Sequence, residues 1–295
     1  MPALSARRFF AVLCLLAGAA GWGIIWYPYR VLNQAGVSGL ASSLISYALP
    51  LLLLGWLHRR ALWGDRDKAL WLAALGLSAG WTNIAYVIAV LGGEIMRVLL
   101  LFYLAPLWTV LFARWLLHEK LTPAGGMVMA LSLAGAASML WPPQGGFPLP
   151  QNTAEWLALS AGMTFALSNV ITRRIGGVAN GSKAVAVWGG VTALALLALL
   201  GKSGQWDFAA SAGIATWAWL ALTAVLIAAM TYAVQWGLSH TPANQAIIIL
   251  LFELVVAALA SYFLAGETMS RQELVGAVLI VAASLFSGKL EQPHA

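Results

Sequence analysis

Ten long apolar segments dominate this sequence, and they constrain its fold more than any other feature. Each is close to the ~20 residues that an α-helix needs to cross a lipid bilayer. Hydrophobic residues make up 61% of the chain and charged residues 9%, against roughly 45–50% and 25% in soluble domains. The sequence therefore predicts an all-α, polytopic membrane protein with ten transmembrane helices. Their predicted spans are residues 9–31, 36–57, 69–91, 95–117, 123–141, 153–172, 182–201, 213–236, 242–265 and 270–288.

The positive charges are distributed unevenly between the two predicted sides of the membrane. With ten crossings, twelve of the sixteen Lys and Arg residues share the side of the N-terminus, and four lie on the other: Arg30, Arg97, Lys202 and Arg271. Cytoplasmic loops carry such an excess of positive charge. We therefore expect a bacterial inner-membrane protein with both termini in the cytoplasm. The net charge of +6 then reports orientation and implies no nucleic-acid partner. The first twenty residues also resemble a secretory signal, but their apolar pattern continues through GWGIIWYPY, which favours a retained first helix.

The segment WPPQGGFPLPQN, residues 141–152, divides the chain into two similar halves. At an offset of 148 residues, Glu119 aligns with Glu267 and Thr122 with Ser270, and at an offset of 143, Arg30 aligns with Arg173. Thr122 followed by Pro123 is also a helix-start signal. We therefore expect two five-helix repeats, residues 1–147 and 148–295. Five is an odd number of crossings, so the second repeat enters the membrane with inverted topology, a recurrent architecture of secondary transporters.

The stretch LFYLAPLWTVLFARWLLHEKLT, with its weaker echo IILLFELVVAALASYFLAGETMS, resembles the repeated helix-four signature of the drug/metabolite transporter superfamily. The resemblance covers essentially the whole chain and points to the ten-helix EamA-type exporters. The motif Tyr-Leu-x-Pro at 103–106 and the aromatic-rich middle of the chain are similar to YddG-like exporters of aromatic amino acids. The second repeat has Phe252-Glu253-Leu254 where such proteins often have a proline, so its helix need not be kinked. Nucleotide-sugar carriers share the architecture, but they would be expected to bury more basic side chains.

Pro106 interrupts the apolar run LLLFYLAPLWTVLF, residues 99–112. Proline removes one backbone hydrogen bond and pushes on the carbonyl four residues earlier, here that of Phe102, a defect that costs about 3 kcal/mol in a soluble helix. In a membrane bundle a neighbour can satisfy the freed carbonyl, or the carbonyl can line a cavity. We predict a kink at Pro106 and a substrate contact from Tyr103, which lies about one turn earlier.

Other aromatic and amide side chains fall inside the predicted spans. An indole or phenol at membrane depth needs a hydrogen-bond partner, and an amide there either joins helices or contacts a polar solute. The candidate substrate-binding residues are Tyr103, Trp81, Tyr86, Trp108, Phe165, Asn83, Asn169, Trp188, Tyr232 and Gln235. Packing stays the alternative for the aromatic residues other than Tyr103, and interhelical hydrogen bonding stays the alternative for the amides. The small residues Gly76 and Gly80 are spaced for close helix packing.

Glu253 is the only carboxylate near the middle of a predicted span. Because burying an ionisable group in a membrane is costly, such a group is a functional candidate. We predict a role in coupling transport to protons, and the alternative is a protonated carboxyl that bonds two helices together.

The sequence gives no indication of an enzyme, a cofactor or a metal site. It lacks a phosphate-binding glycine loop and zinc-ligand spacing, its four histidines lie near predicted helix ends and in the tail, and its single cysteine is Cys14. We therefore expect an exporter of small amphipathic metabolites, above all amino acids, aromatic ones included, which works by alternating access through a central cavity. The alternatives are a nucleotide-sugar or drug carrier of the same fold and a membrane assembly or signalling protein without transport activity. The oligomeric state stays open.

Overall fold

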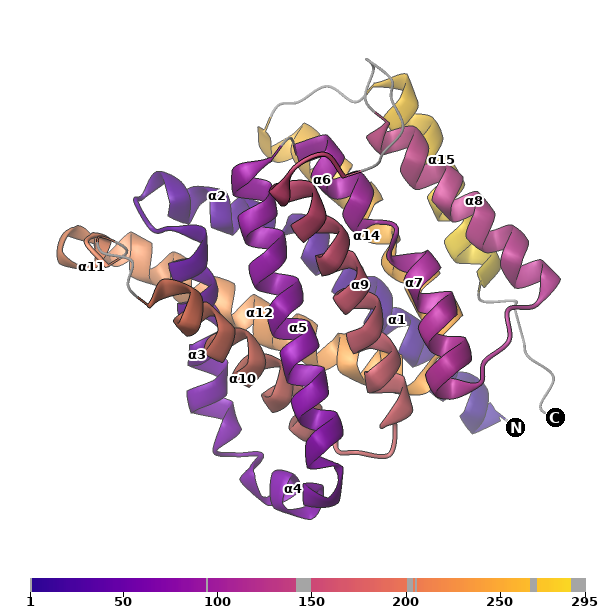
Figure 1. Cartoon of the computed structure of the whole chain (residues 1–295), viewed down its shortest axis with the longest axis horizontal. Coiled ribbons are helices and arrows are strands. Elements are labelled where there is room, and N and C mark those ends of the chain that lie inside the picture. The colour runs from indigo at the N-terminus through magenta and orange to yellow at the C-terminus, as the bar shows by residue number, and fades with distance from the viewer. Residues whose placement is uncertain are drawn as a thin grey trace.

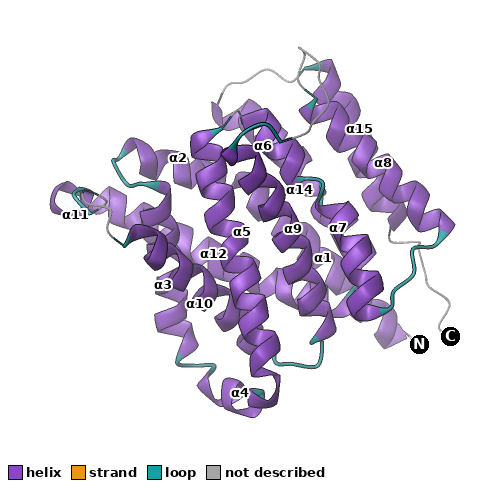
Figure 2. Cartoon of the chain, viewed as in Figure 1, coloured by secondary structure: helices purple, strands orange, loops and turns teal. Residues whose placement is uncertain are grey.

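The structure is a computed structural model that describes residues 2–93, 95–141, 150–200, 204, 206–265 and 270–287. Within these residues the chain is built from helices and connecting loops, without a strand (Figure 2). The all-α prediction is therefore confirmed. Most of the linker at 141–152 lies outside the described residues, as do Glu267 and the last eight residues.

Residues 2–140 form the helices of the first half. They are α1 (Pro2–Ile24), α2 (Trp26–Gln34), α3 (Gly39–Gly55), α4 (Arg59–Gly64), the short 3-10 helix η1 (Arg66–Lys68), α5 (Ala69–Gly92), α6 (Ile95–Phe102), α7 (Ala105–Phe112), the π-helix η2 (Ala113–Leu117) and α8 (Pro123–Leu140). The second half contains α9 (Thr153–Arg174), α10 (Asn180–Leu199), α11 (Phe208–Ser211), α12 (Ile214–His240), α13 (Ala243–Leu250), α14 (Phe252–Ala260), the π-helix η3 (Ser261–Ala265) and α15 (Arg271–Ser287).

Helix occupies each of the ten predicted spans, and three of the spans consist of more than one helical piece. By length and hydropathy, five helices in the described residues are sufficient to cross a membrane: Arg7–Gln34, Arg66–Val90, Asn180–Leu199, Ile214–His240 and Ala243–Leu264. Shorter apolar helices are Gly39–Gly55, Ala105–Leu117, Pro123–Ser138 and Leu274–Ala283. These findings confirm a polytopic membrane protein, while the number of ten crossings stays a prediction.

Several helices begin where the sequence supplies a capping side chain. Thr122 precedes α8, and its hydroxyl accepts a hydrogen bond of 3.0 Å from the backbone N–H of Gly125. Ser38 caps α3 in the same way, and Asn152 caps α9. Each side chain satisfies an amide that has no partner inside its helix. The helix start predicted at Thr122 and Pro123 is thus confirmed.

The two halves interleave, and the packing pattern is the same when the halves are exchanged. α5, in the third span of the first half, packs against α9 and α10, which begin the second half. α12, in the third span of the second half, packs against α1, α2 and α3, which begin the first. α8 and α15, the last helix of each half, lie side by side at one edge (Figure 1). The central region of the bundle therefore contains helices from both halves.

Glycines allow the closest of these contacts. A Cβ atom on Gly80 of α5 would lie 2.5 Å from the carbonyl oxygen of Gly190 in α10, and one on Gly76 would lie 2.6 Å from that of Ala186. Any larger side chain would force the two helices apart. The close packing predicted for Gly76 and Gly80 is confirmed.

The ends of several helices gather at the end of the bundle that carries the N-terminus. Figure 1 shows the N-terminus, α4 and the end of α15 toward the same side of the molecule, away from α2 and from the start of α15. Asp65, next to α4, accepts a hydrogen bond of 2.6 Å from Ser182 at the start of α10. We call this end of the bundle the α4 end.

Candidate functional site

The fourth predicted span is broken just ahead of Pro106. α6 ends at Phe102 and α7 begins at Ala105, so Tyr103 and Leu104 form a turn between them. Pro106 has no N–H, which leaves the carbonyl of Phe102 without its helical donor. That carbonyl faces Gly162 of α9 so closely that a Cβ atom at position 162 would overlap its oxygen. The backbone of α9 therefore covers the carbonyl that the proline frees.

The ninth predicted span is broken at the equivalent place, although it has no proline there. α13 ends at Leu250 and α14 begins at Phe252, so the break falls at Leu251, 148 residues after Tyr103. Leu251 keeps right-handed helical angles and its N–H bonds to the Ile247 carbonyl, so the expectation that this helix need not be kinked stays a prediction. The repeat offset extends further, because the π-helices Ala113–Leu117 and Ser261–Ala265 are also 148 residues apart.

The two breaks meet inside the bundle. The hydroxyl of Tyr103 lies within hydrogen-bonding reach of the Glu253 carboxyl. Tyr103 is 7% exposed, and it packs in one cluster with Leu251 and Leu254 from the other break. A phenol and a carboxyl from two broken helices thus form a polar pair inside an apolar core.

Aromatic rings surround this pair. The ring of Phe102 lies 5.0 Å from that of Tyr86, 5.2 Å from that of Tyr103 and 5.5 Å from that of Phe165, measured between centroids. Such separations are typical of favourable aromatic pairs. We call Tyr86, Phe102, Tyr103, Phe165 and Glu253 the break cluster. The cluster unites α5, α6, α9 and α14 with the turn at Tyr103.

Four other predicted residues have a buried polar atom that lacks a hydrogen-bond partner. These atoms are Oδ1 of Asn83, Nε1 of Trp108, Nδ2 of Asn169 and Nε1 of Trp188. Thr231 of α12 and Ser46 of α3 have partnerless hydroxyls as well. Buried polar atoms are nearly always paired with protein or water. These six side chains therefore mark where water or a polar solute would find unmet hydrogen-bonding groups.

Gln235 and Trp108 have other surroundings. Gln235 is 7% exposed and accepts a hydrogen bond of 2.7 Å from Thr172, which joins α12 to α9. Trp108 packs in a separate cluster with Ala105 and Met129, and Phe165 also borders that cluster.

Two predicted aromatic residues lie at the surface. Trp81 is 42% exposed and donates to the Ser160 hydroxyl. Tyr232 is 40% exposed and stacks on the His58 ring. The structure brings neither of them into the break cluster.

Sequence reasoning did not select the polar residues at the α4 end. Lys183 is 1% exposed and donates to the Ser239 hydroxyl, while Arg173 donates to the Ser239 carbonyl. Glu119 contacts Arg173 and the start of α13. In the sequence these charged residues lie at predicted helix ends. The excess of Lys and Arg on the cytoplasmic side already accounts for the basic residues there. The alignment of Glu119 with Glu267 was the only signal that could have singled out this acid.

Comparison with known families agrees with this arrangement. The model of the EamA-like transporter family matches residues 9–141 and again residues 152–288. The chain belongs to the EamA-like transporter family. The resemblance to the drug/metabolite transporter superfamily is thereby confirmed, and the family is one of membrane transporters. The likeness to YddG-like exporters stays an interpretation.

The names of individual relatives of this EamA-like protein specify no solute. An uncharacterized transporter of Pseudomonas aeruginosa is 29% identical over 159 residues, which is 52% of this chain and 51% of that protein, so the match spans about half of the relative. An uncharacterized transporter of Archaeoglobus fulgidus is 24% identical over 216 residues, 70% of this chain and 72% of that protein. A protein of known crystal structure has a TM-score of 0.73 at 17% identity, over 99% of this chain and 100% of that one. This last likeness shows the fold alone.

Proposed function

We propose that this EamA-like protein exports small amphipathic metabolites without net charge, above all amino acids, with aromatic ones among them. The observation that carries the proposal is the break cluster. It combines a phenol–carboxyl pair with three further aromatic rings at the place where the broken helices of both halves meet. An amino acid needs both kinds of partner, because its head is polar and its side chain is apolar.

Glu253 and other buried polar groups of the bundle suit a zwitterionic head group. Glu253 and the amide oxygen of Asn83 can accept hydrogen bonds from an ammonium group, and the Asn169 amide and the Trp188 indole can donate to a carboxylate. The rings of Tyr86 and Phe165 offer stacking surfaces for an apolar side chain. Among these groups Glu253 is the only one that ordinarily carries a charge. A solute without net charge requires few charged side chains in its site.

Glu253 also has the surroundings of a coupling residue. An ionisable group inside a membrane is costly and is frequently part of a proton relay. If Glu253 binds a proton in one conformation and releases it in the other, proton flow drives the solute across the membrane. The alternative is a protonated carboxyl that bonds permanently to Tyr103, which would make the protein a facilitator.

The transport cycle that we propose exchanges the conformations of two inverted repeats, residues 1–147 and 148–295. The interleaved packing supports this, because each half places its third span against the first two spans of the other. In inverted-repeat transporters one half rocks against the other around a site near the bilayer midplane. With the termini in the cytoplasm, the α4 end is the cytoplasmic end.

The experiment that tests this function uses purified protein in proteoliposomes. Counterflow of labelled aromatic amino acids, nucleotide sugars and cationic dyes is measured in parallel, with protein-free liposomes as the control. We expect counterflow of an amino acid and a several-fold loss with Tyr103→Ala. Counterflow of a nucleotide sugar or a dye alone would contradict the solute class. An absence of all counterflow, with the protein correctly inserted, would favour a role without transport.

A further inference from the structure

Glu119 joins three separate segments at the α4 end of the bundle. Its Oε2 accepts a hydrogen bond of 3.0 Å from the backbone N–H of Ala243, the first residue of α13. Its Oε1 lies 3.5 Å from Nε of Arg173, at the end of α9. Only 12% of the Glu119 side chain is exposed. We call Glu119, Arg173 and the Ala243 N–H the α13 lock.

The local backbone places Glu119 in this position. The π-helix η2 ends at Leu117, and its C-cap residue His118 has a left-handed φ of 58°, the one such value at a non-glycine residue in the described chain. The N–H of Glu119 then bonds back to the carbonyl of Ala113 over 3.2 Å. A left-handed residue followed by a bond to a carbonyl of the last turn is a common way for a helix to end and reverse. The turn directs Glu119 toward α13.

The start of α13 depends on Glu119 because it lacks a cap of its own. Its N-cap residue is Pro242, which makes no side-chain capping bond. A carboxylate at a helix N-terminus satisfies a free N–H and interacts favourably with the positive end of the helix dipole. Here the carboxylate comes from a residue 124 positions earlier in the chain. The cap of α13 is therefore also a contact between the two halves.

A second layer of contacts lies behind Arg173. Its guanidinium donates over 3.1 Å to the carbonyl of Ser239, and the Ser239 hydroxyl accepts a hydrogen bond from the buried Lys183. The same hydroxyl donates to the Gln235 carbonyl. Three helices of the second half, α9, α12 and α13, thus meet at the α13 lock, and α10 is connected to it through Ser239.

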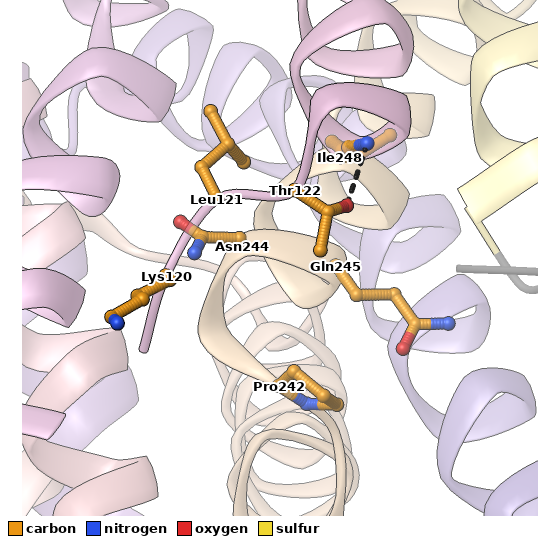
Figure 3. Close-up of a pocket in the computed structure, with 8 residues that line it drawn as sticks. Lys120, Leu121, Thr122, Pro242, Asn244, Gln245 and Ile248 are labelled. Atoms are coloured by element: carbon orange, nitrogen blue, oxygen red, sulfur yellow. Dashed lines mark hydrogen bonds between the residues drawn. The ribbon is translucent and has the colours of Figure 1, made fainter. Parts of the chain in front are cut away.

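The segment that follows Glu119 also lies against α13. Figure 3 shows Lys120, Leu121 and Thr122 beside the start of α13. A small pocket lies between them, with an empty volume of about 360 Å³ that includes open solvent. Asn244 lines this pocket and is 8% exposed, but neither polar atom of its side chain has a hydrogen-bond partner. Figure 3 also shows a hydrogen bond between Thr122 and Ile248. The first N–H of α13, that of Ala243, is bonded by Glu119.

We propose that Glu119 is a positioning residue of the transport cycle, which holds the α4 end closed through the α13 lock and must release α13 when that end opens. This role rests on the proposed alternating access. It requires no contact between Glu119 and the solute. Release breaks the Ala243 bond and the Arg173 ion pair, and the two broken helices then move apart at this end.

Cysteine accessibility tests the role of Glu119 without any solute. The full-length protein, with Cys14→Ser to remove its one native cysteine, is placed in nanodiscs and labelled with a bulky, water-soluble maleimide. Ala243→Cys reports on the lock, and Asn244→Cys replaces it if that variant does not fold. Val37→Cys, in the loop just ahead of α3 and away from α4, is the matched reporter, since Ala243 and Val37 are 2% and 0% exposed.

Three substitutions are compared in each reporter background. We expect Glu119→Ala to accelerate labelling at position 243 about fivefold or more, as for the loss of a helix cap, and to leave the rate at position 37 unchanged or lower. Glu119→Gln keeps an oxygen for the Ala243 N–H and should give an intermediate rate. Arg174→Gln is the control, because this neighbour is exposed and donates to the Leu116 carbonyl instead.

The outcomes separate a positioning role from a purely structural one. Faster labelling at position 243 alone supports the proposal. Equal acceleration of labelling at positions 243 and 37 would mean that Glu119 only stabilises the fold. Unchanged labelling at both positions would mean that the α13 lock does not control access. Either result would overturn the proposal. Because the assay contains no solute, a failed counterflow experiment would leave its result intact.

Discussion

Gly23→Ala offers a sharp test of the break cluster, because the substitution adds a single methyl group behind Glu253. Gly23 lies near the end of α1 and packs against the backbone of α14. A Cβ atom there would lie 2.7 Å from the Glu253 carbonyl oxygen, 2.9 Å from Cβ of Val256 and 3.0 Å from the backbone nitrogen of Ala257. Carbon–oxygen contacts in packed helices are about 3.3 Å or longer. The methyl group therefore has to push the two helices apart by roughly 0.6 Å.

None of the three contacted groups can turn away, because two are backbone atoms and the third is the branch point of a valine. Overpacking of this kind costs about 1–3 kcal/mol. The higher helix propensity of alanine relative to glycine stabilises the folded state by about 0.5–1 kcal/mol. We expect a net destabilisation of about 1 kcal/mol and a larger effect on transport, because the displaced backbone carries Glu253.

The assay compares Gly23→Ala with Gly189→Ala, a control in the middle of α10. A Cβ atom on Gly189 would have its nearest neighbour at 3.9 Å, an ordinary contact with a Leu51 methyl group. The control should keep wild-type counterflow and gain about 0.4–1 kcal/mol in stability. Thermal unfolding in detergent and counterflow in proteoliposomes are measured on both variants. If the two variants behave alike, Gly23 does not position Glu253 and the argument from close packing is wrong.

Other substitutions test separate parts of the structure. Tyr103→Ala should weaken transport several-fold, since losing a ring contact costs roughly 1 kcal/mol, whereas Tyr103→Phe keeps the ring; normal counterflow by both variants would remove Tyr103 from the site. Glu253→Gln should flatten the pH dependence of counterflow, and an unchanged pH profile would favour a facilitator. Gly80→Ala should lower the unfolding temperature by forcing α5 from α10, and an unchanged temperature would contradict that contact. Impermeant labelling of cysteines placed at Gln151 and after Ala295 should reach opposite sides of the membrane, and labelling from one side would refute the inverted repeat.

The sequence predicted the helical segments well because each depends on local properties, namely apolar length and capping residues. Thr122 predicted the start of α8, and Pro106 pointed to the broken fourth span, since a proline acts on its own backbone. The break at Leu251 has no local signal of this kind. It is visible only in the structure, where α13 ends at Leu250 and α14 begins at Phe252.

The candidate site was harder to predict because helical position does not determine which way a side chain points. Trp81, Trp188 and Tyr232 all fall well inside predicted spans, yet Trp188 is 0% exposed whereas Trp81 and Tyr232 are 42% and 40% exposed. The partners of a helix face are distant in sequence, so the face cannot be assigned from the segment alone. The same holds for Glu119, whose contact with Ala243 spans 124 positions.

The two broken helices are held in the same manner, which gives the fold a mechanical consequence. In the first half the freed carbonyl of Phe102 lies against Gly162, in the first span of the second half. In the second half the carbonyl of Glu253 lies against Gly23, in the first span of the first half. Each break therefore rests on a glycine of the opposite half, at the level of the phenol–carboxyl pair. If one half rocks against the other, both glycine contacts must shift together. The same movement would change the distance between Tyr103 and Glu253 and would strain the contacts of the α13 lock.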